Sequence, residues 1–420
     1  MKNNPKESNY HLIVFSIFYL SLLVGFYFNE DNLGGAMNDA IIHFRITEQF
    51  NENFFKTFID FGTKDSVLAT RNSPVFWIFL SFFEKFLSYE IIRILNTGVV
   101  FLIAIILYKS LLIKFKNLNS KTLIILSTFI FISPSLRSLA IWPYSLIWGL
   151  LFFVLSIYFY LKYEQNLNFL RSSIILLTLI WASYIYPSFS VFYIFYIHKI
   201  FQKLKNKNNI IDLLALSFVF SIPAFIYIIS KDFYSVYEGA QGVANLSFAN
   251  SLNISNKILI ISTICLYLIL PVINFKEILL EVKKIKIEYF LILILVCLIN
   301  FYFFNFPHDV WGGGFFHKLS NILFDNNYLF FLSSFISILI IYSVLSKKFS
   351  NYLLLILLIL FNPQYTIYIK YFDPLILILF LTLFDFNLKK HFDKRKLAFY
   401  QFYGTYLFYY LVVYGKKIII

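Results

Sequence analysis

Charged residues are scarce in this sequence: they make up 14% of its 420 positions, whereas 60% are hydrophobic. A typical soluble domain has about 25% charged residues, so the composition excludes an ordinary soluble enzyme and indicates a membrane protein. Cysteine is scarcer still, because only Cys265 and Cys297 occur and both lie in apolar runs. That placement argues against a disulfide framework and against a thiolate metal site.

Several functional motifs are missing as well. The sequence has no nucleophile elbow, no zinc-protease helix and no phosphate-binding loop with the Gly-Lys-Ser/Thr ending. The net charge of +14 is high enough to suggest nucleic acid, but the lysines occur in short loops between apolar runs. Cytoplasmic loops of membrane proteins need that placement, so we expect no nucleic-acid partner.

The sequence does have apolar runs of near-spanning length along the whole chain, and its mean hydropathy is +0.74. These runs predict an all-α polytopic membrane protein with about twelve spans, embedded in the lipid bilayer. The first runs from about His11 to Phe28, and no small-residue cleavage site follows it, so we expect it to be retained. Residues 397–414 are rich in tyrosine and either form a thirteenth span or lie in the membrane interface.

The loop charges predict the topology. Lys2 and Lys6 place the N-terminus in the cytoplasm. The apolar run Pro74–Leu87 is short, and if it crossed the membrane the lysines of the next loop would lie outside. We therefore interpret it as a juxtamembrane or re-entrant helix, and Glu90–Tyr108 as the second span. The longer outer loops are then residues 29–89, 133–144, 231–256, 306–325 and 362–373.

This topology predicts a single transmembrane domain over residues 1–420. Residues 29–89 form its first outer loop with amphipathic and juxtamembrane helices, and residues 90–386 form the bundle. Residues 387–420 form a cytoplasmic basic segment with a further helix. Inner loops are plain lysine runs, whereas the outer loops hold the unusual residues. We therefore expect an active face that points outward from the cytoplasmic membrane of a bacterium.

The first outer loop contains the best candidates for catalysis. It reads as an amphipathic helix from about Ala36 to Asp60, with Gly62 where a stop is expected. Its apolar side carries Ile42, Ile46, Phe50, Phe54 and Phe58, and its polar side carries Arg45, Glu48, Glu52 and Lys56. Asp39 and His43 fall on the apolar side, so we expect them to face protein or membrane.

An acid on that side suits two roles. Asp39 is a candidate general base that accepts a proton from an attacking hydroxyl or amine, with His43 beside it. Alternatively, it ligates a divalent cation that steadies a leaving phosphate. A third alternative is structural: an acid favoured by the dipole at a helix N-terminus, next to a histidine that is bonded to a neighbour.

Cations in the outer loops are candidates for binding a substrate phosphate: Arg71, Arg137, Lys318 and Lys370. Lys370 violates the positive-inside pattern and stands beside Tyr371, which suits a lipid phosphate at the headgroup level; the alternative is a snorkelling lysine. Arg137, between Pro134 and Pro143, suits bidentate phosphate contacts, and its alternative is packing on the aromatic belt.

The segment PHDVWGGGFFHKLSN supplies further candidates. His308, Asp309 and His317 are possible metal ligands together with Asp39, although their spacing matches no strong ligand pattern. The glycines after Trp311 permit close backbone approach to a ligand and an anion-binding nest. The sequence therefore identifies no cofactor, and it leaves a divalent metal ion as an alternative.

Taken in order, these features resemble polytopic glycosyltransferases of the GT-C class, such as protein O-mannosyltransferases and lipid A aminoarabinose transferases. The likeness covers the order and topology of most of the chain and rests on three motifs. These are NDAIIH around Asp39; RNSPVFWIFLSFFEKF followed by EIIRILNTGVVFLIAIILYKSL; and Lys370-Tyr371-Phe372-Asp373-Pro374, a basic-Tyr-x-x-Pro pattern in a late outer loop.

The resemblance implies a GT-C-like fold and inverting transfer of a sugar from a polyprenyl-phosphate-linked donor to a glycan, lipid or protein acceptor. Three alternatives remain: a lipid-linked oligosaccharide polymerase or ligase, a flippase or transporter of lipid-linked glycans, and a structural subunit. A transporter would place charges within its spans near the midplane, and a polymerase would have a large late outer loop with arginines. In this sequence the spans are largely free of ionisable residues, and the late outer loop is short and holds Lys318 and Lys370 instead of arginines.

Overall fold

The computed structural model describes residues 5–31, 35–62, 68, 72–204, 207–230, 253–307, 312–362, 364, 366–393, 400–408 and 411. Every element of regular structure in these residues is helical, which confirms the all-α prediction for them. The chain divides into two compact units, unit 1 (Met1–Ala244 with Tyr410–Ile420) and unit 2 (Asn245–Tyr409). The single transmembrane domain over residues 1–420 stays a prediction.

The helices of unit 1 follow one another in the chain with short connections. They are α1 Pro5–Tyr27, α2 Ala36–Glu52, α3 Phe54–Asp60, α4 Val75–Glu84, α5 Tyr89–Lys114, α6 Ser120–Ser127, α7 Phe129–Ile132, α8 Pro134–Ile141, α9 Ser145–Tyr163, α10 Phe169–Ile185, the 3₁₀ helix η1 Pro187–Phe192, α11 Tyr193–Lys203 and α12 Lys207–Ser230.

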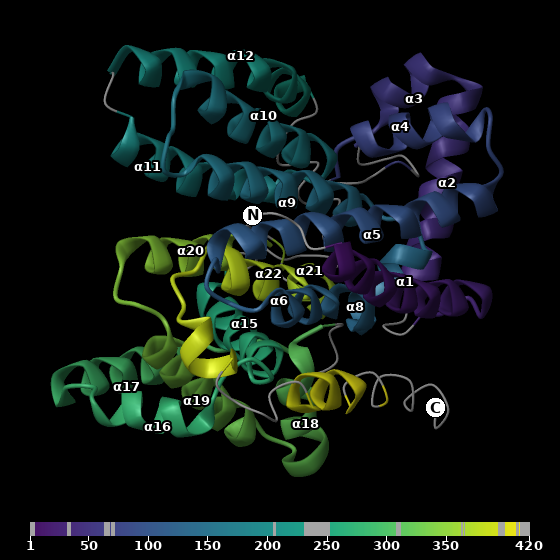
Figure 1. The fold of residues 1–420 in the computed structure, drawn as a ribbon. Coiled ribbons are helices and arrows are strands. Elements are labelled where there is room, and N and C mark those ends of the chain that lie inside the picture. Colours follow the sequence, from purple (N-terminus) through teal and green to yellow (C-terminus); the bar gives the residue numbers. More distant parts are fainter. Residues whose placement is uncertain are drawn as a thin grey trace. The chain divides into compact units, whose positions relative to one another are not determined.

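Long apolar helices build the centre of unit 1. α9 packs against both α5 and α10, and α10 also packs against α12 (Figure 1). The buried residues of α9 recur every three or four positions at Leu146, Leu150, Phe153 and Ile157, which is the spacing of one helix face. This packing holds the helix ends that carry the polar residues described below.

The helix that the sequence predicts over residues 36–60 is interrupted. α2 ends and α3 begins at Asn53, whose side-chain oxygen accepts a hydrogen bond from the Lys56 backbone N–H at 3.1 Å. Asparagine is a strong N-cap residue, so a new helix starts there. The predicted stop is confirmed, because α3 ends at Asp60 and Gly62 takes a positive φ of 78°.

The predicted apolar side of this segment is right for two residues and wrong for three. Ile46 and Phe50 are buried, whereas Ile42, Phe54 and Phe58 are exposed. The break at Asn53 changes which residues of α3 face the rest of unit 1. The predicted polar residues, Arg45, Glu48, Glu52 and Lys56, are all exposed.

α4 is short for a membrane helix. It has 10 residues, which at 1.5 Å per residue cover about 15 Å, half of a hydrocarbon core of about 30 Å. The run Pro74–Leu87 is therefore a helix too short to cross, as the sequence indicates, while its juxtamembrane placement stays a prediction. α5 begins at Tyr89 and has the length of a full span.

The segment Ser133–Tyr144, predicted to be an outer loop, is mostly a buried helix. α6 and α7 turn by 63° into α8, which starts with the hydroxyl of Ser133 accepting from the Leu136 N–H and with Pro134 in the first turn. All residues of α8 are buried. The loop prediction is wrong because the polar residues of this segment find partners inside unit 1.

Unit 2 is organised around α15, which packs against α19, α18 and α22 and is buried over most of its length. Its helices are α15 Ile254–Ile269, α16 Phe275–Lys283, α17 Ile287–Tyr302, α18 Gly314–Phe324, α19 Tyr328–Val344, α20 Phe349–Leu360, α21 Ile369–Phe372, α22 Leu375–Thr382 and the π-helical turn η2 Lys389–Asp393. Residues 400–408 are also helical.

Several helices are long and apolar enough to cross a membrane. Within the described residues there are 4, or up to 6 if the two bent helix pairs each count as one span. Other predicted spans are shorter apolar helices, such as Phe169–Ile185 and Tyr328–Val344. The structure therefore indicates a membrane protein, whereas the count of about twelve or thirteen spans stays a prediction.

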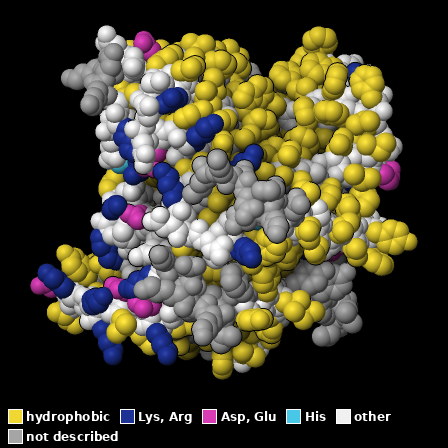
Figure 2. Space-filling model, in the orientation of Figure 1, with side chains coloured by type: hydrophobic (Ala, Val, Ile, Leu, Met, Phe, Trp, Pro, Cys, Tyr) yellow, Lys and Arg dark blue, Asp and Glu magenta, His cyan; other side chains and the backbone are white. Residues whose placement is uncertain are grey.

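Exposed hydrophobic side chains support this conclusion. Figure 2 shows them over much of the visible face. In α17, for example, Leu291, Leu295 and Leu298 are each more than half exposed, at 57%, 58% and 56%. A soluble monomer rarely exposes large contiguous apolar patches, and a helix that faces lipid has no reason to avoid them.

Candidate functional site

The start of α2 is fixed by Asp31. Its two carboxylate oxygens accept hydrogen bonds from the backbone N–H groups of Gly35 and Ala36, at 3.2 and 3.3 Å. Gly35 has a φ of 97°, a left-handed conformation that glycine adopts without steric cost. The carboxylate also interacts favourably with the positive end of the helix dipole. The first turn of α2, which carries Asp39, therefore has a defined direction.

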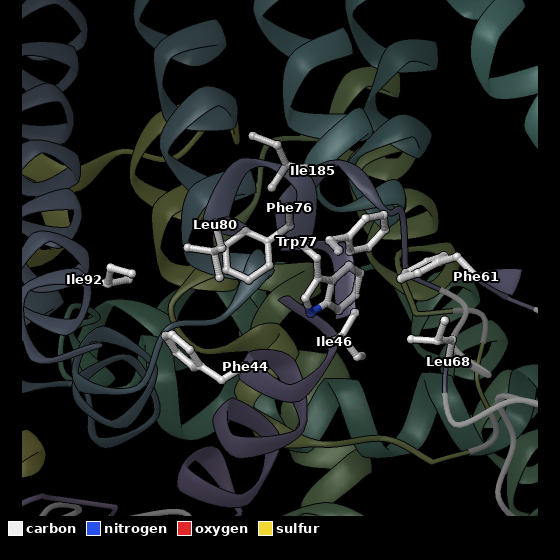
Figure 3. Close-up of a cluster of buried hydrophobic side chains, with 10 residues drawn as sticks. Phe44, Ile46, Phe61, Leu68, Phe76, Trp77, Leu80, Ile92 and Ile185 are labelled. Atoms are coloured by element: carbon white, nitrogen blue, oxygen red, sulfur yellow. The ribbon is translucent and has the colours of Figure 1, made fainter. Parts of the chain in front are cut away.

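α2 rests on α4 through a cluster of buried hydrophobic side chains. Figure 3 shows Phe76 and Trp77 of α4 in the middle of this cluster, with Phe44 of α2 and Phe61 on either side. The rings of Phe61 and Trp77 have their centres 5.2 Å apart. Each fully buried side chain of this size contributes about 1.5–3 kcal/mol, so the cluster gives α2 a rigid base.

The two predicted catalytic residues are four positions apart on α2, so they share one side of the helix. Asp39 is half-buried and His43 is 6% exposed. The Nδ1 atom of His43 lies 3.4 Å from the carbonyl oxygen of Pro143, and its ring lies 5.0 Å from Tyr144 and 5.2 Å from Trp77. His43 therefore faces protein, as expected, whereas for the half-buried Asp39 the expectation stays a prediction.

These contacts define what His43 can do. A proton on Nδ1 donates to the Pro143 carbonyl, which leaves Nε2 as the basic nitrogen of the ring. The aromatic neighbours hold the ring in place, and Thr47 donates its hydroxyl hydrogen to the His43 carbonyl at 2.9 Å. The pair of a half-buried carboxylate and a buried imidazole, one helical turn apart, is suited to accepting and passing a proton.

Arg137 forms a buried ion pair with Glu30. Its Nε and Nη2 atoms each lie 2.7 Å from one carboxylate oxygen of Glu30, and both residues are at most 6% exposed. Nη1 donates to the Ser21 hydroxyl and the Phe131 carbonyl, and Nη2 also donates to the Ser21 carbonyl. Arginine has five N–H donors, and these contacts use all of them.

This arrangement bears on the prediction that Arg137 binds a substrate phosphate. A phosphate could bind Arg137 only by displacing the Glu30 carboxylate or a backbone carbonyl. The displaced group would then be buried without a hydrogen-bond partner, which costs free energy. The guanidinium instead ties α8 to the end of α1. The Trp142 indole adds to this by donating to the Glu30 carbonyl at 3.1 Å.

Arg93 lies beside this pair and stacks on aromatic rings. Its guanidinium is 3.9 Å from the centre of the Trp142 ring and 4.7 Å from that of Phe26. It also donates to the Asn29 side chain at 2.8 Å and to the Ile141 carbonyl at 3.2 Å. The sequence analysis gives packing on aromatic rings as the alternative role of Arg137. In the structure it is Arg93, and not Arg137, whose guanidinium packs on such rings.

Asn96 completes the polar network one turn along α5. Its amide donates to the Leu139 and Ala140 carbonyls at 2.9 and 2.7 Å, and its oxygen accepts from the Trp148 indole at 2.9 Å. Sequence reasoning assigned no role to Glu30, Arg93 or Asn96. The available signal was their position: polar residues at the membrane ends of apolar runs, which are expensive to bury without partners.

In unit 2, the predicted glycine turn closes onto the chain itself. Gly312, Gly313 and Gly314 have φ angles of 105°, 82° and 79°. A Cβ on Gly312 would lie 2.7 Å from the Ile367 carbonyl oxygen, which also accepts a hydrogen bond from the Gly313 N–H at 3.1 Å. The close approach that the glycines permit is therefore an approach to residues 366–368.

The same turn brings two groups of candidates into one region of unit 2. His317 is 1% exposed and lies among the rings of Phe304, Phe306 and Phe330. Ile367, whose carbonyl accepts the hydrogen bond from Gly313, lies three residues before Lys370 in the chain. The turn at Gly312–Gly314 and the segment that carries Lys370 are thus neighbours.

Lys370 lies beside tyrosine rings, as the sequence suggests. Its Nζ atom is 5.4 Å from the ring centre of Tyr368 and 5.8 Å from that of Tyr371. Tyr371 is 3% exposed, Lys370 is half-buried and Lys318 is exposed. Asp373, at the end of α21, is fully buried. A half-buried ammonium flanked by aromatic rings suits an anionic headgroup.

Some predicted residues lie outside the described part of the chain: Arg71, His308 and Asp309. Among the described residues, no group of three histidine, cysteine, aspartate or glutamate side chains is arranged to hold a metal ion. Asp39 and His317 belong to different units. The expectation that Asp39 and Lys370 border one cavity also joins residues of both units, and it stays a prediction.

Comparison with known proteins finds no matching family model, no matching curated protein and no matching solved structure. The described residues form a helical protein, and several of its helices are long and apolar enough to cross a membrane.

Proposed function

We propose that this protein is a membrane glycosyltransferase with a GT-C-like fold. It transfers a sugar from a polyprenyl-phosphate-linked donor to a glycan, lipid or protein acceptor at the outer face of a bacterial cytoplasmic membrane. The proposal includes the finer topology of about twelve or thirteen spans, with α4 as a juxtamembrane helix in the first outer loop.

The observation that carries the proposal is the Asp39 and His43 pair. A half-buried carboxylate and a buried imidazole occupy one side of a helix that directly follows an apolar span-length helix. Asp31 and the Phe76–Trp77 cluster fix that helix rigidly. Catalytic groups need such fixed supports, because small displacements of the reacting atoms cost much of the rate.

The chemistry follows from the groups present. The acceptor hydroxyl or amine attacks C1 of the sugar from the face opposite the phosphate, and the bond from C1 to the phosphate oxygen breaks. The phosphate leaves on the polyprenyl chain with the bonding electrons, and Asp39 takes the acceptor proton. Positioned bases of this kind contribute about 10²–10⁴-fold to rate. No nucleotide is consumed, because the donor carries its own leaving group.

Lys370 is the proposed contact for the donor phosphate, with Tyr371 beside it and Lys318 and Arg71 as further cations. Support comes from its half-buried position over the Tyr368 and Tyr371 rings. An ammonium next to apolar rings gains more from an anion than a fully hydrated one does, since the effective dielectric is lower. A divalent metal ion bound by Asp39 remains the alternative to the base role.

The test is transfer of a radiolabelled sugar from a polyprenyl-phosphate donor by protein reconstituted in vesicles. Asp39→Asn keeps the shape of the side chain and removes its charge, so we expect a rate about 10²–10⁴-fold lower. Glu48→Gln is the matched control, because Glu48 is exposed on the same helix. Lys370→Ala should raise the donor concentration needed for half-maximal rate.

Each result separates one reading from another. Full activity of Asp39→Asn would remove Asp39 from the site but leave the reaction class. Partial recovery of Asp39→Asn at higher divalent ion concentration would favour the metal role. Wild-type protein that moves the lipid across the bilayer without cleaving the sugar–phosphate bond would overturn the glycosyltransferase proposal. Repeated addition of whole glycans would identify a polymerase or ligase.

A further inference from the structure

Unit 2 contains a cleft that the proposed reaction does not use. It lies between α15, α17, α19 and α20 and has a volume of about 230 Å³. Pockets for compact small molecules usually measure about 300–1,000 Å³, so this cleft suits something thinner. It follows α20 from Asn351 to Ile359, and the rise along the helix between these two residues is about 12 Å.

The lining changes character along the cleft. Its interior is formed by aliphatic side chains, among them Ile261, Leu293, Ile338 and Leu355. Most of its polar residues gather at one end, where the chain turns from α19 into α20: Tyr342, Ser346, Lys347, Asn351 and Tyr352. Ser262 of α15 also lines the cleft. A long apolar channel with a cationic end matches a molecule that has a hydrocarbon tail and an anionic head.

The cation at this end is available for a ligand. Lys347 donates to the Tyr342 carbonyl and lies over the Tyr342 ring. No carboxylate among the described residues pairs with it, and an ammonium has three N–H donors. The neighbouring lysine differs, because Lys348 forms an ion pair with Asp385. One cation of the turn is therefore neutralised on the surface. The other has no carboxylate within ion-pair distance among the described residues, and Glu281 acts on it only from further away.

The shape of this end is fixed by Asn351. Its amide donates to the Ser346 carbonyl at 2.9 Å, and its oxygen accepts from the Asp385 N–H at 2.9 Å. The turn is thus held in place without any ligand. On the other side of the cleft, α17 contributes the half-buried Leu293 to the lining. The exposed Leu291, Leu295 and Leu298 lie on a different face of the same helix.

We infer that this cleft binds one chain of an anionic membrane phospholipid, with the headgroup phosphate at Lys347. The occupant is a lipid rather than free phosphate, because most of the lining is aliphatic and gains nothing from a hydrophilic anion. It is an anionic lipid rather than a neutral one, because the only charge at the cleft is positive among the described lining residues. This inference does not depend on the glycosyltransferase proposal.

The experiment measures lipid binding to the purified full chain in detergent. Phosphatidylglycerol and phosphatidylcholine with the same oleoyl chains are added separately, and bound lipid is counted by native mass spectrometry alongside the unfolding temperature. We expect phosphatidylglycerol to bind more tightly and to raise the unfolding temperature more. A basic residue near a membrane surface contributes about 1 kcal/mol toward anionic lipid, or about fivefold in affinity.

Three variants make the test specific. Lys347→Gln should lose this preference of about fivefold, and Lys347→Arg should retain it. Lys348→Gln is the matched control and should behave like wild type, since Lys348 pairs with Asp385 outside the cleft. Leu355→Trp fills a half-buried part of the lining and should weaken binding of both lipids; Leu355→Phe serves if the larger side chain prevents folding.

Some results would overturn the inference. They are equal binding of the two lipids, equal loss in Lys347→Gln and Lys348→Gln, or protection by inorganic phosphate as strong as that by phosphatidylglycerol. Association of two copies of the chain that excludes lipid and is blocked by Leu355→Trp would assign the cleft to a protein interface instead.

Discussion

The two units use their cations in different ways. In unit 1, Arg137 is buried and gives all its N–H donors to Glu30, Ser21 and Phe131. In unit 2, Lys347 has no carboxylate partner among the described residues and stands at the end of an apolar cleft. The difference teaches that a cation at the edge of an apolar helix is not by itself a binding residue. Whether it can bind a ligand depends on how many of its N–H donors are already taken by acceptors within the protein.

The chemistry of the side chains explains this division. Arginine presents a planar fork that matches a carboxylate with two parallel hydrogen bonds, so it can be buried at low cost once it is paired. Lysine carries a compact, strongly hydrated charge on a flexible stem and is easily moved toward a ligand. A buried arginine paired with a glutamate therefore indicates a structural role, and a lysine without an ion-pair partner at a cleft is a candidate for binding a ligand.

The largest effect should come from breaking the ion pair of unit 1. Glu30→Ala leaves Arg137 buried without its carboxylate, and such a change typically costs about 3–5 kcal/mol. We expect a large fall in the unfolding temperature of the purified protein, or loss of folded protein from the membrane. Replacing both partners with apolar residues, Glu30→Leu with Arg137→Met, should restore most of the stability, because buried pairs are often replaceable by hydrophobic residues.

That experiment also tests the substrate role of Arg137. If the double variant folds and transfers sugar at the wild-type rate, Arg137 acts only in structure. If it folds but loses activity while Glu48→Gln keeps it, Arg137 has a further role in the site. Wild-type stability in Glu30→Ala alone would contradict the description of the pair as a structural tie.

A smaller effect should follow from filling the space that the ion pair occupies. A Cβ on Gly25 would lie within 2.2 Å of a Glu30 carboxylate oxygen and 2.7 Å of Arg137 Nη2. Gly25→Ala should therefore displace the pair, at a cost of about 1–3 kcal/mol. Gly98→Ala in α5 is the control, because nothing lies within 4 Å of its added Cβ. Alanine there should leave the unfolding temperature unchanged or raise it.

The lysine of unit 2 predicts a dependence of lipid binding on pH. Desolvation lowers the pKa of Lys347 to about 8, with Glu281 acting in the opposite direction. Tyr342, Tyr352 and Cys265 also line the cleft, and Lys348 with its partner Asp385 lies at the same turn. The charged form exists below the pKa, and a bound anion favours that form. The preference for phosphatidylglycerol should therefore be full near pH 6 and fall as pH rises beyond about 8.

The control for this pH dependence is Lys347→Arg, whose guanidinium stays charged throughout this range. Its lipid preference should not change between pH 6 and pH 9, a span chosen about the Lys347 pKa of about 8. Equal pH dependence in wild type and Lys347→Arg would assign the titration to another group.

The smallest effect concerns the carboxylate at the end of α4. Burial and the nearby Glu48 raise the pKa of Glu84, while the hydrogen bond from Asn51 at 2.8 Å acts in the opposite direction. A raised pKa means that the charged form is less favourable in the folded state, so this group costs stability above its folded pKa and the cost disappears as pH falls. Glu84→Gln should be neutral or slightly stabilising at pH 7, by less than about 1 kcal/mol.

The check for this prediction is the unfolding temperature of Glu84→Gln and wild type at pH 5 and pH 7. The gap between the two proteins should be smaller at pH 5, where wild-type Glu84 gains its proton more readily in the folded state. A clear loss of stability in Glu84→Gln at pH 7 would mean that the charge on Glu84 is favourable.

Much of the helical framework could be predicted from the sequence. The apolar runs indicate α1 and α5, the short run after Pro74 indicates a helix that cannot cross, and Gly62 marks the end of α3. These predictions rest on local properties: hydrophobicity, length and the conformational freedom of glycine. The position of Lys370 beside tyrosine rings also follows from its immediate neighbours in the chain.

The errors arose where a residue's partner is distant in the chain. The segment around Arg137 reads as a loop because it contains serine, proline and arginine, yet it is a buried helix because Glu30, 107 residues earlier, accepts two of its hydrogen bonds. The glycines at 312–314 suggest a ligand site, yet they face the protein itself: Gly312 faces Ile367, Gly313 faces His317 and Phe306, and Gly314 faces Ile260 and Ile264. Contacts between residues so distant in the chain cannot be predicted from the sequence around either partner.

By itself, the sequence determined that this chain is helical and rich enough in apolar runs to enter a membrane, because hydrophobicity and helix periodicity act over neighbouring residues. Only the tertiary structure decided which charged side chains have hydrogen-bond or ion-pair partners within the protein. Arg137 and Arg93 are buried among partners supplied by α1 and α8, whereas Lys347 meets an apolar cleft formed by four helices. The physical reason is that the cost of a buried charge depends on the acceptors around it, and folding brings those from far along the chain.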